Sequence, residues 1–461
     1  MTLPQAVYAK LLTRAEPGRG YPLWFPEPNH WLPLEYREVG LRIGDVGVVT
    51  EHGSFDVFFN ICLPADHPLH STFGVPDGFT QVCLSDQDME SFVPGDRHGR
   101  VVAAQSISQR NLSIGAGVPA SSFVSAQRGI GFEFTSASNE GAILVLPEGA
   151  DRHDLRNHLV FEGEALRNGK SWYEFALRKL GRTMISLDSL YLITGCHQTS
   201  SWSLAAFHHP PGGSQFNAQF TAGPIINSNI NAAYSWKMAS AVPYRIGPQH
   251  YNATQRNQAV FIRGYKIAVR DNRFLGRLLG DVTMSYESPN TVSRRKKIYH
   301  PSDLLIECIM RSEPACEIFV IHDHVWSSVY DEVMLLLLRS GTDLLTIPKL
   351  PQGWDTTEYD PEIVRRIHEK YSVVSSNGTT YIISDKNFNY NWTEQDELML
   401  IENALQERVE TCGWVSNGLT CNIPVRGRDF SVHLRDSHGV IGTPASQHKC
   451  CWNGCHVAKW G

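Results

Sequence analysis

Four residues near the end of the chain have the types and the spacing of a metal-binding finger. They are Cys412, Cys421, His433 and His438, which form the pattern C-x8-C-x11-H-x4-H. Thiolates and imidazoles are the ligands that Zn²⁺ takes in tetrahedral protein sites, and C2H2 fingers space them in a similar way. The loop of eight residues between the two cysteines is longer than in such fingers. The pattern therefore predicts a zinc site in a variant finger.

The residues between these ligands fit the small core of a ββα finger. Val425 follows the second cysteine by four residues, and Phe430 precedes the first histidine by three. Residues 428–438 can form a helix, with both histidine rings on its inner face. We expect residues 410–440 to fold as a ββα-like module around the metal. The alternative is two unrelated cysteines beside two surface histidines.

A second group of cysteines follows the first. Cys450, Cys451 and Cys455 lie in KCCWNGCHVAKWG, which resembles the opening of another finger. The chain ends before a second pair of histidines, although His448 or His456 could complete a ligand set. The group is either a truncated finger, which we favour, or a set of free thiols.

The finger raises the question of nucleic-acid binding. With His433 as helix position 7, Arg426 and Arg428 occupy two base-reading positions, and Arg426 could contact guanine. A single finger buries little surface, however, and specific DNA binding normally uses several fingers in array. A protein partner is therefore the favoured prediction, and nucleic-acid binding through Arg426 and Arg428 is the alternative.

Composition describes an ordinary globular chain. The 461 residues are 42% hydrophobic and 19% charged, and the net charge of −6 excludes a polyanion binder as a whole. No signal peptide and no apolar run of 18 residues are present. The other five cysteines are scattered among apolar neighbours, as reduced core cysteines are. These features predict a location in the cytoplasm or nucleus, and they leave the oligomeric state open.

The common catalytic motifs are absent. The chain contains no phosphate-binding loop, no G-x-S-x-G and no H-E-x-x-H. His322, Asp323 and His324 follow an expected strand, but adjacent residues point to alternate sides, so one metal seldom binds all three. We therefore predict a non-catalytic protein, an interpretation that a cluster of these residues with other titratable groups in a pocket would overturn.

Periodicity predicts an α+β fold with four parts. Residues 1–40 are expected to form an extended segment, 41–290 a large β-rich antiparallel domain, and 299–385 a small α/β domain. Residues 393–461 are expected to form a helix followed by the zinc-binding tail. The basic run 294–297 would lie in a linker.

Individual elements can also be predicted. Strands are expected at 190–195, 202–207 and 259–270, and a hairpin at 216–241. Apolar spacing in 151–180 predicts two helical stretches that begin at Asp151 and break at Gly169. Asn377 and Gly378 predict the turn of another hairpin. Further helices are expected at 326–338, after Asp360 and after Thr393.

Two resemblances add to this interpretation. The segments GYPLWFPEPNHWLPLEYREVGLRIGDVGVVTEHGSFDVFFNIC, LYLITGC and NQAVFIRGYKIAVR resemble, in their order, a large family of uncharacterised proteins from mushroom-forming fungi. The resemblance covers roughly residues 20–385 and implies an intracellular fungal protein, without implying an activity. The tail resembles the degenerate C2H2 fingers common in those genomes.

The second resemblance is to gasdermin pore-forming domains and covers about 80 residues. It rests on LYLITG, the alternating hairpin that follows, and AVFIRGYKIAV. This resemblance implies strands able to insert into a bilayer. An ordinary half-buried antiparallel sheet has the same pattern and is far commoner, and the first 100 residues lack the basic lipid-binding patch that a pore former would need. A membrane is therefore the less favoured partner.

Overall fold

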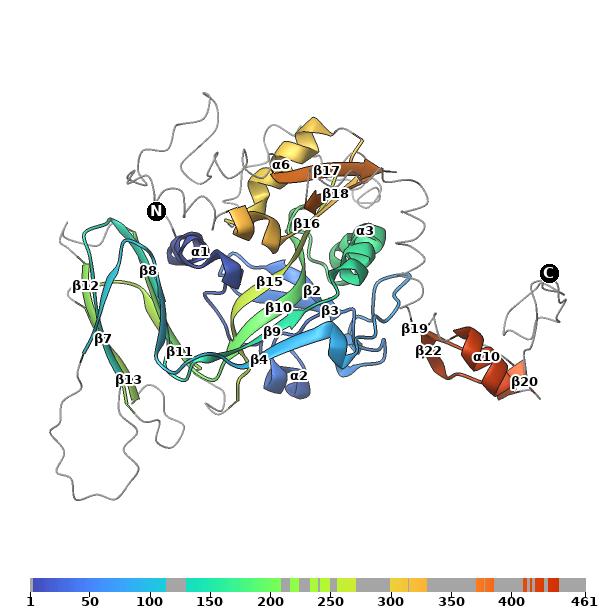
Figure 1. The fold of residues 1–461 in the computed structure, drawn as a ribbon, viewed down its shortest axis with the longest axis horizontal. Coiled ribbons are helices and arrows are strands. Elements are labelled where there is room, and N and C mark those ends of the chain that lie inside the picture. Colours follow the sequence, from blue (N-terminus) through green and yellow to red (C-terminus); the bar gives the residue numbers. More distant parts are fainter. Residues whose placement is uncertain are drawn as a thin grey trace, which may run out of the picture.

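We describe the fold from a computed structural model. The residues that it places well enough to describe are 3–112, 130–208, 216–223, 233–238, 241–248, 255–270, 299–313, 315–329, 370–376, 378–384, 409–412, 415–416, 419–426 and 430–438. They form an α+β fold dominated by antiparallel sheet, which confirms the predicted fold class (Figure 1).

A ten-stranded sheet forms the centre of the molecule. Its two longest strands are β10 (Leu190–Thr199) and β15 (Gln258–Val269), which pair antiparallel and are buried over nearly their whole length. Both lie where the sequence predicted strands. The remaining strands are β1 (Tyr21–Pro22), β2 (Asp45–Val49), β3 (Phe55–Asn60), β4 (Met89–Asp96), β9 (Ala150–Leu155), β16 (Ile318–His322), β17 (Tyr371–Ser376) and β18 (Thr379–Ser384).

Each long strand has two different neighbours along one edge. The first half of β10 pairs with β2 and its second half with β9, which continues to β4. Likewise β15 pairs with β16 over Tyr265–Val269 and with β1 at Phe261 and Ile262. Since β16 adds β18 in parallel and β18 adds β17, one sheet crosses the boundary that the sequence predicted between 290 and 299.

Two four-stranded sheets face each other as a sandwich beside the central sheet (Figure 1). Apolar residues of the two sheets pack against each other, and the rings of Phe207 and Phe216, one from each sheet, stack at 4.2 Å between centroids. One sheet contains β14 (Tyr244–Gly247), β11 (Trp202–His208), β8 (Glu140–Leu146) and β5 (Arg100–Ala103). The other contains β13 (Tyr234–Met238), β12 (Phe216–Ala222), β7 (Ile130–Ser136) and β6 (Ser108–Asn111).

The sequence predicts an extended segment over residues 1–40, but part of this segment is helical in the structure. Residues Pro4–Ala15 form helix α1, whose Tyr8 and Leu12 pack on the outer face of the sandwich sheet beside Leu144 and Leu204. Proline at the first position, where no intrahelical N–H is needed, suits the start of this helix. Short helical turns follow at η1 (Pro17–Arg19), α2 (Leu34–Val39), η2 (Pro68–His70) and η3 (Asp86–Asp88).

One face of the central sheet is covered by α3 (His158–Glu174), which continues as the π-helical segment η4 (Phe175–Lys179). The predicted helix start at Asp151 was wrong, because residues 150–155 form β9. The predicted break at Gly169 was also wrong. A Cβ atom at Gly169 would lie 2.5 Å from Cδ1 of Ile318, so the glycine lets the helix approach the sheet closely.

The opposite face of β15 and β16 is covered by α6 (Ser302–Ser312) and by a helical segment over residues 323–329. The hairpin predicted at Asn377 and Gly378 is present as β17 and β18, with Gly378 at a φ of 79°. The strands of the hairpin predicted at 216–241 are present as β12 and β13.

Several predicted elements lie outside the described residues. They are the linker at 294–297, the helix beyond 329, the helix after Asp360, the helix after Thr393 and the cysteine group at 450–455. Within the described part of the chain, no helix has the length and apolar character needed to cross a membrane.

Candidate metal centre

The C-terminal module has the ββα order that the sequence predicted. Strand β19 (Val409–Thr411) pairs antiparallel with β22 (Pro424–Arg426), and helix α10 (Phe430–His438) follows. Val425 is buried, as expected for the small core, whereas the side chain of Phe430 lies outside the description.

Hydrogen bonds explain how two cysteines nine positions apart come together. The N–H of Cys412 donates to the carbonyl of Ile423 at 2.8 Å, and the N–H of Asn422 donates to the carbonyl of Cys412 at 2.9 Å. Asn422 has a φ of 54°, a left-handed conformation that asparagine tolerates better than most residues. The two bonds close the loop at its base. The extra residues form a second small hairpin, β20 (Val415–Ser416) with β21 (Leu419–Thr420).

All four predicted ligands meet at one point. The Sγ atoms of Cys412 and Cys421 and one ring nitrogen each from His433 and His438 lie within 4.8 Å of one another. Among the residues described, no other group of three or more histidine, cysteine or acidic side chains meets this criterion. The four residues therefore form a group that could hold a metal ion.

The distances between the ligand atoms are similar. Sγ of Cys412 lies 3.4 Å from Nε2 of His438, and Sγ of Cys421 lies 3.5 Å from Nε2 of His433. The two Nε2 atoms lie 3.2 Å apart. Four donors at such spacing surround a single point, as the corners of a tetrahedron do.

The four residues differ in burial, and the surroundings of His438 favour the form that binds metals. Cys412 is fully buried, and the other three residues are half-buried. Burial and the neighbouring His433 lower the pKa of His438, which favours its neutral imidazole. A neutral imidazole has a lone pair free for a metal.

The arginines predicted to read bases are not placed by the structure. Arg426 is the last residue of β22, but its side chain lies outside the description, as does all of Arg428.

The structure places His322 and Asp323 in the protein interior. The ring of His322 accepts the backbone N–H of His324 at Nδ1, and its Nε2 lies 2.8 Å from Oγ1 of Thr194. Asp323 accepts hydrogen bonds from Tyr191, from Nε1 of Trp326 and from the N–H of Gly264. These bonds connect β16 to β10, to β15 and to the helical segment that follows it. Nδ1 of His324 also lies 2.8 Å from Nδ1 of His322, and Nε2 of His300 lies 3.5 Å from Oδ1 of Asp323.

Sequence reasoning missed two polar clusters that long-range pairing builds. One gathers His158 around His322, with ring centroids 4.7 Å apart. The other gathers Arg19, Arg152, Arg263 and His197, drawn from four separate segments. The run of four polar residues, DRHD at 151–154, is the available signal, but the helical spacing of Leu155 and Leu159 predicts a helix there instead.

Comparison with known proteins does not identify the chain. No family model matches it, and no curated protein matches it. The resemblances to a fungal family and to gasdermins therefore stay predictions.

Proposed function

We propose that this chain is a non-catalytic intracellular binding protein whose C-terminal module is folded around one Zn²⁺. The observation that carries the zinc assignment is the spacing of the four ligand atoms. Zinc bonds of about 2.3 Å to sulfur and about 2.05 Å to nitrogen give tetrahedral edges of about 3.6 Å for S–N and about 3.3 Å for N–N. The distances of 3.4, 3.5 and 3.2 Å agree with these edges within about 0.2 Å.

A set of four protein ligands supports a structural role for the ion. Catalytic zinc sites keep a position for water or substrate, whereas structural sites are closed by four side chains. The module is also too small to fold on apolar burial alone, since its strands β19 and β22 span three residues each. Metal binding would supply the missing folding free energy.

The proposal that the rest of the chain is a binding scaffold rests on how its polar groups are used. His322 and Asp323, the pair singled out for chemistry, have their polar atoms engaged by β10, by β15 and by the helical segment that follows β16. None of the six cysteines whose side chains are described forms a disulfide, which supports a reducing compartment such as the cytoplasm or nucleus. The most suitable partner for a module of this kind is another protein.

Metal analysis of the purified full chain tests the proposal. We expect one zinc per chain in the unmodified protein and none retained after Cys421→Ser. Cys83→Ser provides the matched control, since Cys83 is a half-buried cysteine outside the module. Less than half an equivalent of zinc in the unmodified protein, or the same zinc content in both variants, would refute the assignment.

A further inference from the structure

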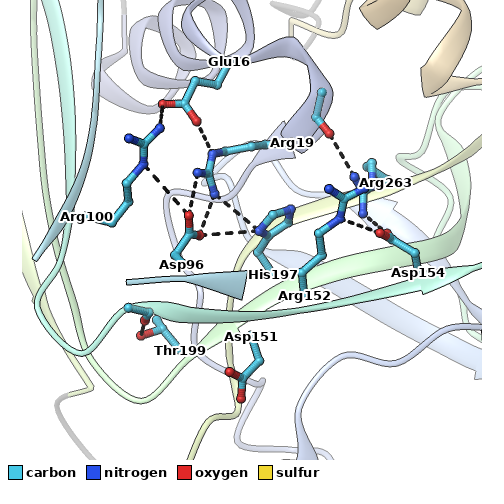
Figure 2. Close-up of polar contacts among 12 residues, drawn as sticks. Glu16, Arg19, Asp96, Arg100, Asp151, Arg152, Asp154, His197, Thr199 and Arg263 are labelled. Atoms are coloured by element: carbon cyan, nitrogen blue, oxygen red, sulfur yellow. Dashed lines mark hydrogen bonds and ion pairs between the residues drawn. The ribbon is translucent and has the colours of Figure 1, made fainter. Parts of the chain in front are cut away.

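A cluster of charged side chains lies on the central sheet beneath η1 (Figure 2). Strand register explains it. Arg152 of β9 lies directly opposite His197 of β10, and Arg263 of β15 lies opposite Gly195 of β10. Arg19 of η1 reaches down over this face, where its guanidinium stacks on the ring of Phe261.

Two of the arginines in the cluster are fully neutralised. Arg19 makes two hydrogen bonds of 2.7 Å to the carboxylate of Asp96 and a third to Glu16. Arg100 also pairs with Glu16. Burial alone would lower the pKa of Arg19, but the bonds to Asp96 and Glu16 outweigh it and raise that pKa. The guanidiniums of Arg19 and Arg100 are therefore balanced by the carboxylates of Asp96 and Glu16.

The other two arginines share one carboxylate. Both Arg152 and Arg263 pair with Asp154, and Glu90 on the neighbouring strand is paired with Arg156 instead. Burial, and then the charge of Arg152, lower the pKa of Arg263 to about 9. Among the described residues, Asp154 is the carboxylate in ion-pair contact with both guanidiniums, and Asp323 opposes the lowering of the Arg263 pKa without pairing with it.

Gly195 makes room for this arrangement. A Cβ atom at Gly195 would lie 2.5 Å from Oδ1 of Asp154 and 3.2 Å from Nη2 of Arg263. The missing side chain lets the ion pair cross directly over β10.

His197 adds a buried donor. Its Nδ1 lies 3.4 Å from Nη1 of Arg19 and 3.8 Å from Oδ2 of Asp96. The guanidinium is the nearer group and only donates, so we assign Nδ1 as the acceptor. Burial lowers the pKa of His197 although Asp96 opposes the shift, which favours a neutral ring, and with Nδ1 as the acceptor its single proton lies on Nε2. That atom is buried and has no hydrogen-bond partner among the residues described. Figure 2 shows the ring between Arg19 and Arg152.

We propose that Arg152, Arg263 and Nε2 of His197 bind a phosphate-type oxyanion. Nη1 of Arg263 already donates to the carbonyl of Gly18 at 2.9 Å. The ion supplies acceptors for the unpartnered imidazole N–H and for the guanidinium N–H groups that Asp154 and Gly18 leave free. It also brings a second anionic group to two arginines that share one carboxylate. The side chain of Arg152 is 41% exposed while that of His197 is 6% exposed. One face of the anion thus lies against the protein and another faces solvent, so the site takes inorganic phosphate or the phosphoryl group of a small phosphomonoester.

Isothermal titration of the full chain with inorganic phosphate, at constant ionic strength, tests this site. We expect saturable 1:1 binding that Arg152→Gln weakens about tenfold or more, the usual effect of losing charge-assisted hydrogen bonds. Arg156→Gln is the control, because Arg156 is an exposed arginine just after the same strand and the change removes the same charge. No saturable binding, or equal weakening by both variants, would overturn the proposal.

A second measurement needs no variant. In ¹⁵N-histidine-labelled protein, phosphate should shift the Nε2 resonance of His197 along the same saturation curve. A His197 resonance that stays unchanged while heat of binding is observed would place the anion elsewhere and overturn the site. Titration with glycerol 3-phosphate distinguishes the two candidate ligands, inorganic phosphate and a small phosphomonoester. Tighter binding than that of phosphate assigns a phosphomonoester, and weaker binding assigns free phosphate.

Discussion

Sγ of Cys412 and Nε2 of His438 lie 3.4 Å apart although 26 residues separate them in the chain. The contact joins the end of the first strand of the C-terminal module to the last turn of its helix. This distance matches the edge between a sulfur and a nitrogen ligand of one tetrahedral zinc ion, about 3.6 Å, to within about 0.2 Å.

Removal of the metal should therefore unfold the module alone. We expect a strong chelator to abolish the hydrogen-exchange protection of the amides of Cys412 and Asn422, which bond across the base of the loop. The amides of β10 and β15 should keep their protection, because they lie in the central sheet. Protection of the Asn422 amide that survives complete zinc removal would contradict a metal-dependent fold.

Replacing Gly169, in the middle of α3, by alanine should lower the stability of the protein, although alanine has the higher helix propensity. Alanine in place of glycine normally stabilises a helix by about 1 kcal/mol. At Gly169 the new methyl would collide with Ile318 and Ile267, so Gly169→Ala should destabilise the protein by about 1–3 kcal/mol. Denaturant unfolding measures the change.

A second variant, Ile318→Val, tests whether contact with Ile318 causes the loss of stability in Gly169→Ala. Ile318→Val removes the Cδ1 atom that a Cβ at Gly169 would approach to 2.5 Å. We expect the double variant to be more stable than the sum of the two single changes implies. Strict additivity, or an increase in stability from Gly169→Ala alone, would show that the close approach does not set the identity of residue 169.

His322 gives a prediction for pH. Burial, and then the charges of His324, His158 and Arg263, lower its pKa well below the usual value for histidine. The unfolded chain therefore takes up a proton near pH 6.5 while the folded chain does not. Stability is lost as the pH falls below about 6.5, with a slope of up to about 1.4 kcal/mol per pH unit for this one site.

A variant separates this contribution from others. Burial raises the pKa of Asp323 to about 6, which has the opposite sign, since its contribution is lost as the pH rises through that value. The Asp323 contribution should be largely common to wild type and His322→Gln, so the difference between their stability curves isolates His322. We expect the variant to be flatter below pH 6.5, and His98→Gln, at an exposed position, to match the wild type. Parallel curves for wild type and His322→Gln would be inconsistent with a buried neutral imidazole.

Liposome leakage distinguishes the scaffold from a pore former. The strands that resemble gasdermin hairpins are paired and packed, with β12 facing the sandwich core and β15 buried over nearly its whole length. We expect no dye release from anionic liposomes by the full chain. Because β16 to β18 continue the same sheet, deleting residues after 290 would expose a sheet edge and confuse the result.

A more decisive version of this experiment cleaves the chain and keeps both fragments in the sample. A protease site inserted between 290 and 299 allows leakage to be measured before and after cleavage. We expect none in either state. Leakage that begins on cleavage would favour the pore former.

The features predicted correctly from sequence depend on local patterns. The grouping of the four cysteine and histidine residues follows from spacing within 27 residues, β15 from one apolar run, and the turn at Gly378 from its dipeptide. Each of these is determined by neighbours in the chain.

The features that were missed depend on pairing between distant segments. Strand β9 was taken as helix because Leu155 and Leu159 have helical spacing, and only its pairing with β4 and β10 makes it a strand. The sheet that crosses residue 290 arises from β15 and β16, about fifty residues apart. The cluster at Arg152, Arg263 and His197 needs three strands in register, so no single segment indicates it.

X-ray absorption at the zinc edge of the purified full chain tests the central claim most directly. The account predicts a four-coordinate ion with two sulfur ligands at about 2.3 Å and two nitrogen ligands at 2.0–2.1 Å. His438→Asn should reduce the nitrogen shell while leaving both sulfurs. A first shell of five or six oxygen and nitrogen atoms, or one without sulfur, would contradict the account.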